Sequence, residues 1–156
     1  MGNEIERKFL VNSNEWRYGA KPVHTCQGYL ASAGECTVRV RLQGDQAFLT
    51  IKGPSEGIAR LEYEYDIPAA DAKELLARLC QQPYIEKNRY DVMFAGLKWE
   101  VDEFLGENEG LIVAEVELES EEQQIELPPW VGQEVSDDPR YRNSNLVSNP
   151  YYKWGK

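Results

Sequence analysis

The sequence predicts a mainly β (α+β) protein in which eight antiparallel strands close into a barrel with a charged interior, that is, a tunnel. Three observations lead to this prediction. Apolar and polar residues alternate with a period of two through eight runs, as they do in half-buried strands. The connections between most runs are short, which favours an antiparallel sheet that closes on itself. Charges on the polar faces are grouped by sign instead of being mixed.

The elements follow in chain order from this alternation. The eight predicted strands cover residues 4–11, 25–31, 36–42, 46–52, 60–67, 84–94, 97–104 and 111–118. Pro68 ends the fifth strand, and residues 69–82 then show helical spacing with Leu75, Leu76 and Leu79 on one face. Residues 106–110 read GENEG, a turn composition that separates the last two strands.

The segment after the last strand is predicted to contain two short helices. We expect a short acidic helix over residues 120–125, a break at Pro128 and Pro129, and a final helix over residues 139–147. Asp137 or Asp138 is expected to cap that final helix. The chain contains no internal repeat, low-complexity stretch or linker, so residues 1–156 are predicted to form a single domain.

Composition and charge exclude several classes of function. The 17 Lys and Arg against 27 Asp and Glu give a formal net charge of −10, which argues against nucleic-acid partners and anionic membranes. Without a membrane-spanning run or signal-peptide features, we expect a cytoplasmic protein. The three cysteines lack C-x-x-C spacing, so free thiols are expected, and neither a disulfide framework nor a zinc site. His24 is the single histidine, and no glycine-rich phosphate loop is present.

Like charges recur at every second position of the predicted strands. The basic pairs are Arg39 with Arg41 and Lys87 with Arg89, and the acidic pairs are Glu4 with Glu6, Glu62 with Glu64, and Glu115 with Glu117. Such pairs repel each other unless something of opposite charge lies between them. A polyphosphate would balance the basic pairs, and Mg²⁺ or Mn²⁺ would balance the carboxylates. The charged faces are therefore predicted to line the barrel interior, and helices are expected to cover the apolar face outside.

A series of short motifs resembles a known family. The series is E-x-E-x-K at residues 4–8, then Arg39-x-Arg41, Lys52, Arg60-x-Glu62-x-Glu64, Lys87-x-Arg89, Glu100-x-Asp102 and Glu115-x-Glu117. It resembles the CYTH superfamily, the triphosphate tunnel metalloenzymes, and most of all the short bacterial members that hydrolyse inorganic triphosphate. The resemblance covers nearly the whole chain. It implies an eight-stranded antiparallel tunnel with a C-terminal helix, near residues 141–146, at one tunnel end.

The resemblance also implies a set of site residues. The substrate-binding residues would be Lys8, Arg39, Arg41, Lys52, Lys87 and Arg89, which hold the triphosphate. The metal ligands would be Glu4, Glu6, Asp102, Glu115 and Glu117, which hold one or two Mg²⁺ or Mn²⁺ ions. Glu62 and Glu64 would join Lys8 and Asp102 as catalytic residues, orienting water or basic side chains.

The expected activity is metal-dependent hydrolysis of inorganic triphosphate to pyrophosphate and phosphate, by a monomer or a homodimer. One alternative is another reaction of the same superfamily on an organic triphosphate: adenylate cyclisation of the class IV type, or hydrolysis of thiamine triphosphate or a nucleoside triphosphate. The short loops provide no obvious base-recognition segment. The other alternative is a non-enzymatic binder of polyphosphate or nucleotide. The acidic pairs argue against it, because carboxylates beside an anion do not help to bind it.

Overall fold

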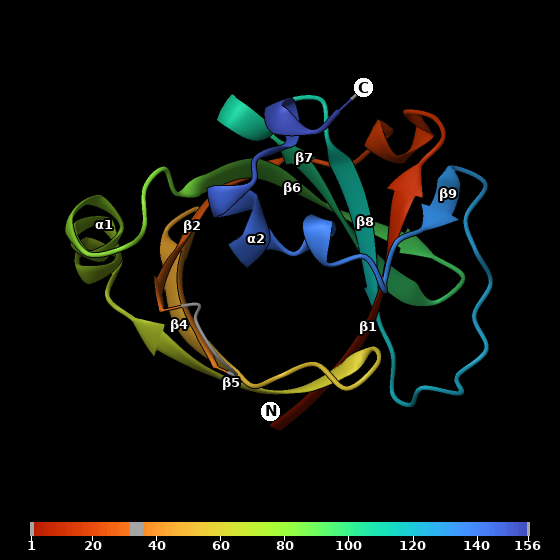
Figure 1. Ribbon diagram of the computed structural model, residues 1–156. Coiled ribbons are helices and arrows are strands. Elements are labelled where there is room, and N and C mark those ends of the chain that lie inside the picture. The colour runs from red at the N-terminus through yellow and green to blue at the C-terminus, as the bar shows by residue number, and fades with distance from the viewer. Residues whose placement is uncertain (1, 32–35, 156) are drawn as a thin grey trace.

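The computed structural model describes residues 2–31 and 36–155, and eight of its strands form a closed antiparallel barrel (Figure 1). These strands are β1 (Gly2–Val11), β2 (Val23–Ala31), β3 (Thr37–Gln43), β4 (Gln46–Lys52), β5 (Ala59–Ile67), β6 (Ile85–Phe94), β7 (Leu97–Phe104) and β8 (Ile112–Glu117). Their order is β5-β4-β3-β2-β6-β7-β8-β1, and residues 2–5 of β1 pair with β5 to close the circle. The predicted eight-stranded antiparallel barrel is confirmed.

The hydrophobic core lies mainly outside the barrel wall. Alternate residues of each strand point outward, and among them Trp99, Val101 and Ala114 are completely buried. The indole of Trp99 packs against Phe9 and Trp130, with ring centroids 5.6 and 5.7 Å away. Since neighbouring residues of a strand face opposite sides, burying this apolar set outside directs the charged set into the barrel.

Helix α1 (Ala69–Arg78) covers the outside of β3 and β4. It ends four residues before the predicted boundary at 82, and Pro83 disfavours a helical conformation at the last residue of the predicted range, Gln82. Leu79 consequently lies outside the helix and is exposed, so its predicted place on the apolar face is wrong. The wall approaches the α1 segment closely at Gly28, where an added Cβ would lie 2.8 Å from the Cβ of Cys80.

The predicted acidic helix over residues 120–125 is wrong. The segment forms a turn in which the backbone N–H of Gln123 donates to the carbonyl of Ser120. A single turn of helix is not stable without an apolar face, and only Ile125 packs against the core here. A ninth strand that the alternation did not predict, β9 (Val131–Glu134), then pairs with the C-terminal part of β1 outside the closed circle.

The predicted final helix over residues 139–147 is divided into η3 (Pro139–Tyr141) and α2 (Asn143–Ser148), because Arg142 between them is extended. The side chain of Asp138 caps η3 by accepting from the backbone N–H of Arg140, as predicted for one of the two aspartates. Figure 1 shows α2 within the ring of strands, which confirms a C-terminal helix near one tunnel end. Three further short helices are η1 (Glu15–Arg17), η2 (Gly106–Asn108) and η4 (Tyr151–Lys153).

Coverage of the apolar face is less complete than predicted. Leu61, Tyr63 and Tyr65 on the outer face of β5 are exposed, since α1 lies over β3 and β4 and does not reach them. The expectation that helices cover this face therefore holds for β3 and β4 and is wrong for β5. In the described part of the chain, no helix has both the length and the apolar character needed to cross a membrane.

Candidate active site

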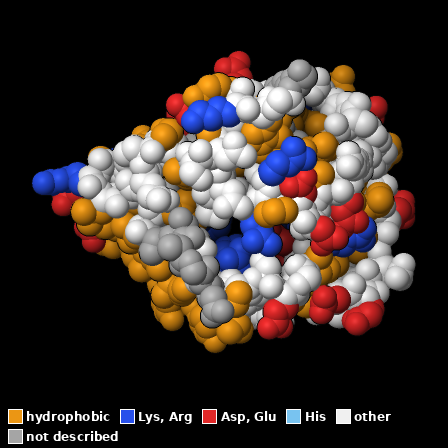
Figure 2. Space-filling view, viewed as in Figure 1, with side chains coloured by type: hydrophobic (Ala, Val, Ile, Leu, Met, Phe, Trp, Pro, Cys, Tyr) orange, Lys and Arg blue, Asp and Glu red, His pale blue; other side chains and the backbone are white. Residues whose placement is uncertain are grey.

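The barrel interior contains a charged cavity of about 220 Å³, to which all eight barrel strands and the start of α2 contribute. Figure 2 shows its opening, with Lys and Arg side chains visible inside. Its charged lining comprises the cations Lys8, Arg39, Arg41, Lys52, Arg60, Lys87, Arg89 and Arg142 and the anions Glu4, Glu6, Glu62, Glu64, Glu100, Glu115 and Glu117. Thus twelve of the thirteen predicted site residues line one cavity, and the thirteenth, Asp102, is buried beside Lys87 and Arg89, which line it.

Arg39 and Arg41 project from β3 into this cavity. The two guanidinium groups donate to the same carboxylate oxygen of Glu64, at 3.4 and 3.1 Å, and Thr50 also donates to it at 2.9 Å. The Nε atoms of both arginines are buried and have no hydrogen-bond partner in the described part of the chain. Burial and the adjacent Arg39 lower the pKa of Arg41 to about 10. The pair therefore combines closely spaced positive charges with hydrogen-bonding capacity that the protein does not use.

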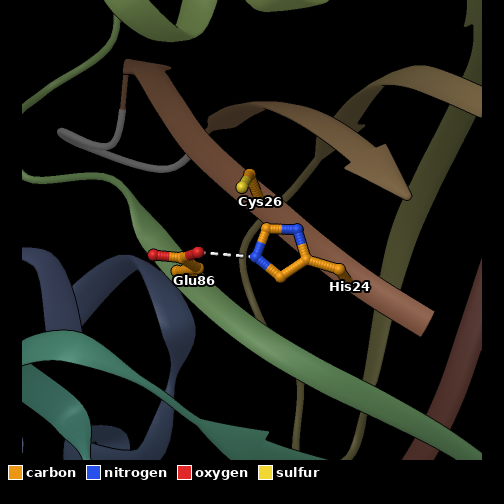
Figure 3. A group of neighbouring side chains, drawn as sticks. All are labelled: His24, Cys26 and Glu86. Atoms are coloured by element: carbon orange, nitrogen blue, oxygen red, sulfur yellow. Dashed lines mark hydrogen bonds and ion pairs between the residues drawn. The ribbon is translucent and has the colours of Figure 1, made fainter. Parts of the chain in front are cut away.

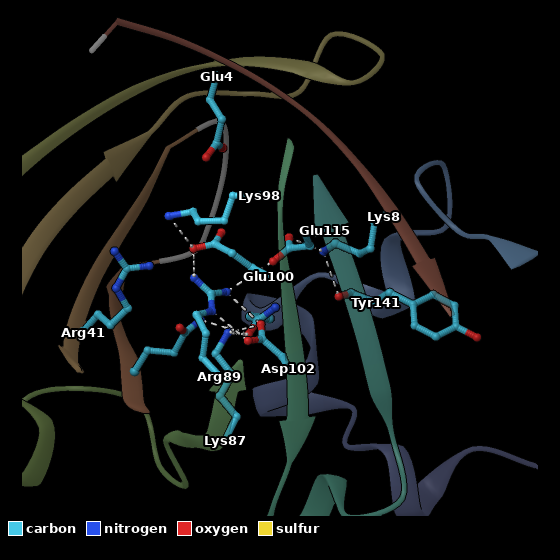
Figure 4. A network of polar contacts seen from close by, with 12 residues as sticks. Glu4, Lys8, Arg41, Lys87, Arg89, Lys98, Glu100, Asp102, Glu115 and Tyr141 are labelled. Atoms are coloured by element: carbon cyan, nitrogen blue, oxygen red, sulfur yellow. Dashed lines mark hydrogen bonds and ion pairs between the residues drawn. The ribbon is translucent and has the colours of Figure 1, made fainter. Parts of the chain in front are cut away.

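Lys87, Arg89 and Asp102 form a buried network on β6 and β7 (Figure 4). The ammonium of Lys87 donates to Asp102 at 2.8 Å, and Arg89 donates to both oxygens of the same carboxylate, at 2.7 and 2.8 Å. Register explains the meeting, because Arg89 lies directly opposite Asp102. Burial lowers the pKa of Lys87 to about 8. The repulsion of Arg89 also lowers this pKa, whereas the attraction of Asp102 raises it.

The acidic side of the cavity comes from β1 and β8. Lys8 pairs with Glu115 and Glu6 with Glu117 in the strand register, so their side chains share one face. Burial, followed by the charges of Glu115 and Glu4, raises the pKa of Glu6 well above its usual range. Although burial opposes it, the cations Lys8 and Arg89 hold the pKa of Glu115 far below its usual range. At Glu6, burial and the repulsion of neighbouring carboxylates therefore outweigh the attraction of Lys52 and Lys8.

Two lysines connect the basic and acidic parts of the cavity. Lys52 donates to Glu4 at 2.9 Å and lies 3.2 Å from a carboxylate oxygen of Glu62. Lys8 lies 3.7 Å from Glu115 and donates to the backbone carbonyl of Tyr141 at 3.2 Å. The second contact joins β1 to the segment that carries α2, so the C-terminal segment is held against the cavity wall.

Several residues that line the cavity, among them Arg60 of the motif series, were assigned no role from the sequence. Arg60 alternates with Glu62 and Glu64 on β5, so the period of two could have identified it. Arg142 and Asn143 carried no such signal, because they come from the C-terminal segment and not from a strand. The amide oxygen of Asn143 accepts from Lys87 at 2.9 Å and from the Gln27 amide at 3.0 Å.

Comparisons with known proteins agree with this geometry. The CYTH domain family model matches residues 2–146. The chain is 54% identical over 151 residues to an inorganic triphosphatase of Acetivibrio thermocellus, with 97% of each chain covered. It is 38% identical over 149 residues to an inorganic triphosphatase of Nitrosomonas europaea, covering 92% of this chain and 96% of that one. The crystal structure of the inorganic triphosphatase NE1496 superposes with a TM-score of 0.67 at 36% identity, covering 94% and 95% of the two chains. This chain, with its charged tunnel, therefore belongs to the CYTH domain family.

Proposed function

We propose that this protein hydrolyses inorganic triphosphate to pyrophosphate and phosphate inside its tunnel, with the help of a divalent metal ion. The observation that carries the proposal is the cavity itself, where cationic side chains from several strands converge and the Arg39 and Arg41 Nε donors are unused within the described chain. The curated relatives at 54% and 38% identity, both inorganic triphosphatases, support the same substrate.

Charge balance supports the need for a metal ion. Eight cationic and seven anionic side chains line the cavity, so the lining is close to neutral. A triphosphate carries a charge of about −4 to −5 near neutral pH, given that the last proton of a terminal phosphate leaves near pH 6. Binding such an anion in a nearly neutral, partly desolvated cavity is unfavourable unless further positive charge enters with it. Divalent cations supply this charge.

The donor set fits a hard divalent cation. Glu4, Glu6, Glu115 and Glu117 offer carboxylate oxygens from adjacent strands, and we propose that they hold Mg²⁺ or Mn²⁺. Such an ion would neutralise charge on the phosphate oxygens and, as a Lewis acid at those oxygens, would make the terminal phosphorus more electrophilic. Asp102 is a less suitable ligand than the sequence suggested, because both of its oxygens already accept from Lys87 and Arg89. We therefore assign Asp102 mainly to positioning these two cations.

The protein's own residues then perform binding and alignment. Lys8, Arg39, Arg41, Lys52, Lys87 and Arg89 donate charge-assisted hydrogen bonds to the phosphate oxygens. Glu64 fixes the two arginines of β3 through its shared hydrogen bonds, which makes it a positioning residue. We assign to Glu62 the orientation of the attacking water. The water oxygen bonds to a terminal phosphorus as the bridging P–O bond breaks, pyrophosphate leaves, and the water proton passes to a carboxylate or to solvent.

The test is phosphate release from inorganic triphosphate, with ATP and pyrophosphate as parallel substrates, in the presence of Mg²⁺, Mn²⁺ or a chelator. We expect triphosphate to be the preferred substrate and the chelator to abolish its hydrolysis. Preferred hydrolysis of ATP, or formation of cyclic AMP from it, would instead assign the tunnel to an organic triphosphate. Tight triphosphate binding without any metal-stimulated release would identify a binding protein.

The proposal predicts an alkaline limit to activity that originates from Lys87. Its pKa of about 8 lies below the usual value of 10.5, so Lys87 loses its charge as the pH rises above about 8. We expect kcat/KM, which reports ionisations of the free enzyme, to fall by about tenfold per pH unit there. In Lys87→Arg the cation stays charged, so the limit should move to higher pH. A pH profile with the same alkaline limit in both proteins would show that another group, or the metal-bound water, causes it.

A further inference from the structure

Three side chains with different donor atoms meet on the outer wall of the barrel, on the opposite face of β2 and β6 from the tunnel lining (Figure 3). His24 and Cys26 share one face of β2, and Glu86 of β6 lies directly opposite Cys26 in the register. This face is the outer one, because the residues that alternate with them, Gln27 and Lys87, line the tunnel.

The three donors converge closely. The His24 Nε2 and Glu86 Oε2 atoms are 2.5 Å apart, and one ligand atom from each of the three residues lies within 4.8 Å of the other two. Within residues 2–31 and 36–155, no other group of three His, Cys, Asp or Glu side chains brings ligand atoms together in this way. The imidazole and the carboxylate are each about half exposed, so an ion can reach them from solvent.

We propose that His24, Cys26 and Glu86 form a Zn²⁺ site on the outer wall of the barrel. An imidazole nitrogen, a thiolate sulfur and a carboxylate oxygen are the three ligand types that Zn²⁺ takes in proteins. Ligand atoms at tetrahedral angles around zinc lie about 3.5 Å apart, so binding requires the His24 and Glu86 ligand atoms, now 2.5 Å apart, to separate by about 1 Å. Solvent supplies the fourth ligand. Mg²⁺, which prefers oxygen ligands only, does not compete for this site.

This site would join the two strands that hold the C-terminal segment. Cys26 precedes Gln27 and Glu86 precedes Lys87, and both of these tunnel residues donate to the side-chain oxygen of Asn143 in α2. A Zn²⁺ ion that bridges β2 and β6 therefore adds a link across the strand pair on which α2 is anchored. We expect it to raise the unfolding temperature of the protein, because an ion that binds only the folded state stabilises that state.

The test uses Co²⁺ as a spectroscopic substitute for Zn²⁺ on the full chain, with excess Mg²⁺ to occupy tunnel carboxylates and without triphosphate. We expect one Co²⁺ per chain to give a thiolate-to-metal charge-transfer band that stoichiometric Zn²⁺ removes. The band should vanish in Cys26→Ser. His24→Gln and Glu86→Gln should each weaken binding at least tenfold. The matched control is Cys36→Ser, whose exposed thiol lies outside the cluster and whose loss should leave the band unchanged.

Triphosphate hydrolysis in Mg²⁺ alone is the folding control, since none of the three residues lines the tunnel. The zinc proposal is overturned if wild-type protein shows no thiolate band, if the band survives in Cys26→Ser, or if it is lost in Cys36→Ser. If Cys26→Ser is misfolded and loses hydrolysis, the Co²⁺ affinity of His24→Gln tests the site instead. His24 is exposed, so its replacement leaves the core intact. Wild-type affinity in His24→Gln would then contradict the site.

Discussion

Replacing Arg39 with alanine is expected to lower kcat/KM for inorganic triphosphate by about 10²–10³-fold, the loss found when one preorganised hydrogen-bond donor to transition-state charge is removed. Arg39 is mostly buried in the tunnel wall, and Thr50 and Glu64 hold its guanidinium in place. Arg39→Lys should recover only part of the rate, because an ammonium keeps the charge but not the planar fork that binds phosphate oxygens in pairs. Steady-state kinetics at saturating metal measures both variants.

Arg140→Ala is the matched control for this experiment. Arg140 is an exposed arginine that pairs with Asp138 outside the tunnel, so its removal should leave kcat/KM unchanged. Circular dichroism and thermal unfolding establish that each variant is folded. Near-wild-type kcat/KM in a folded Arg39→Ala protein would remove Arg39 from the substrate-binding set and weaken the assignment of the whole basic wall.

Replacing Glu6 with glutamine is expected to separate activity from stability. Activity at millimolar metal should fall by about 10²-fold, and the metal concentration for half-maximal rate should rise, since altering even the partners of metal ligands costs 10–100-fold. Stability without metal should rise. Burial and the charges of Glu115 and Glu4 raise the pKa of Glu6 in the folded protein. Near pH 7 the Glu6 carboxylate is ionised in the unfolded chain, so folding must either protonate it or bury its charge, and both lower the free energy of unfolding. The neutral amide removes this cost.

The measurements for Glu6→Gln are metal titrations of activity and the unfolding temperature in chelator. Glu107→Gln, an exposed carboxylate in η2, is the control and should change neither quantity. An unchanged metal requirement would contradict the assignment of Glu6 as a ligand. A lower unfolding temperature would instead show that Glu6 makes a net favourable structural contact, which the like-charged neighbours do not suggest.

The strands were largely predictable because their signal is local. Alternation with a period of two depends on the face that each side chain occupies, and a strand with one buried face cannot shift its register without exposing its core residues. The boundaries of β4 and β7 therefore agree with the sequence to the residue. The helices were less predictable. The segment over 120–125 has helical composition, but only Ile125 packs against the core, and α1 ends four residues before the predicted boundary.

The alternation within each strand established which residues share a face, and so it placed Arg39 with Arg41 and Lys87 with Arg89 on the inner wall. It could not determine which side chains meet across the barrel. Asp102 contacts Lys87 and Arg89 because the register of β6 and β7 places it opposite Arg89. Asn143 contacts Lys87 because the C-terminal segment folds into the tunnel end. His24, Cys26 and Glu86 likewise meet only when β2 and β6 pair. Such contacts depend on pairing between residues distant in the chain, and this pairing forms only when the whole barrel folds.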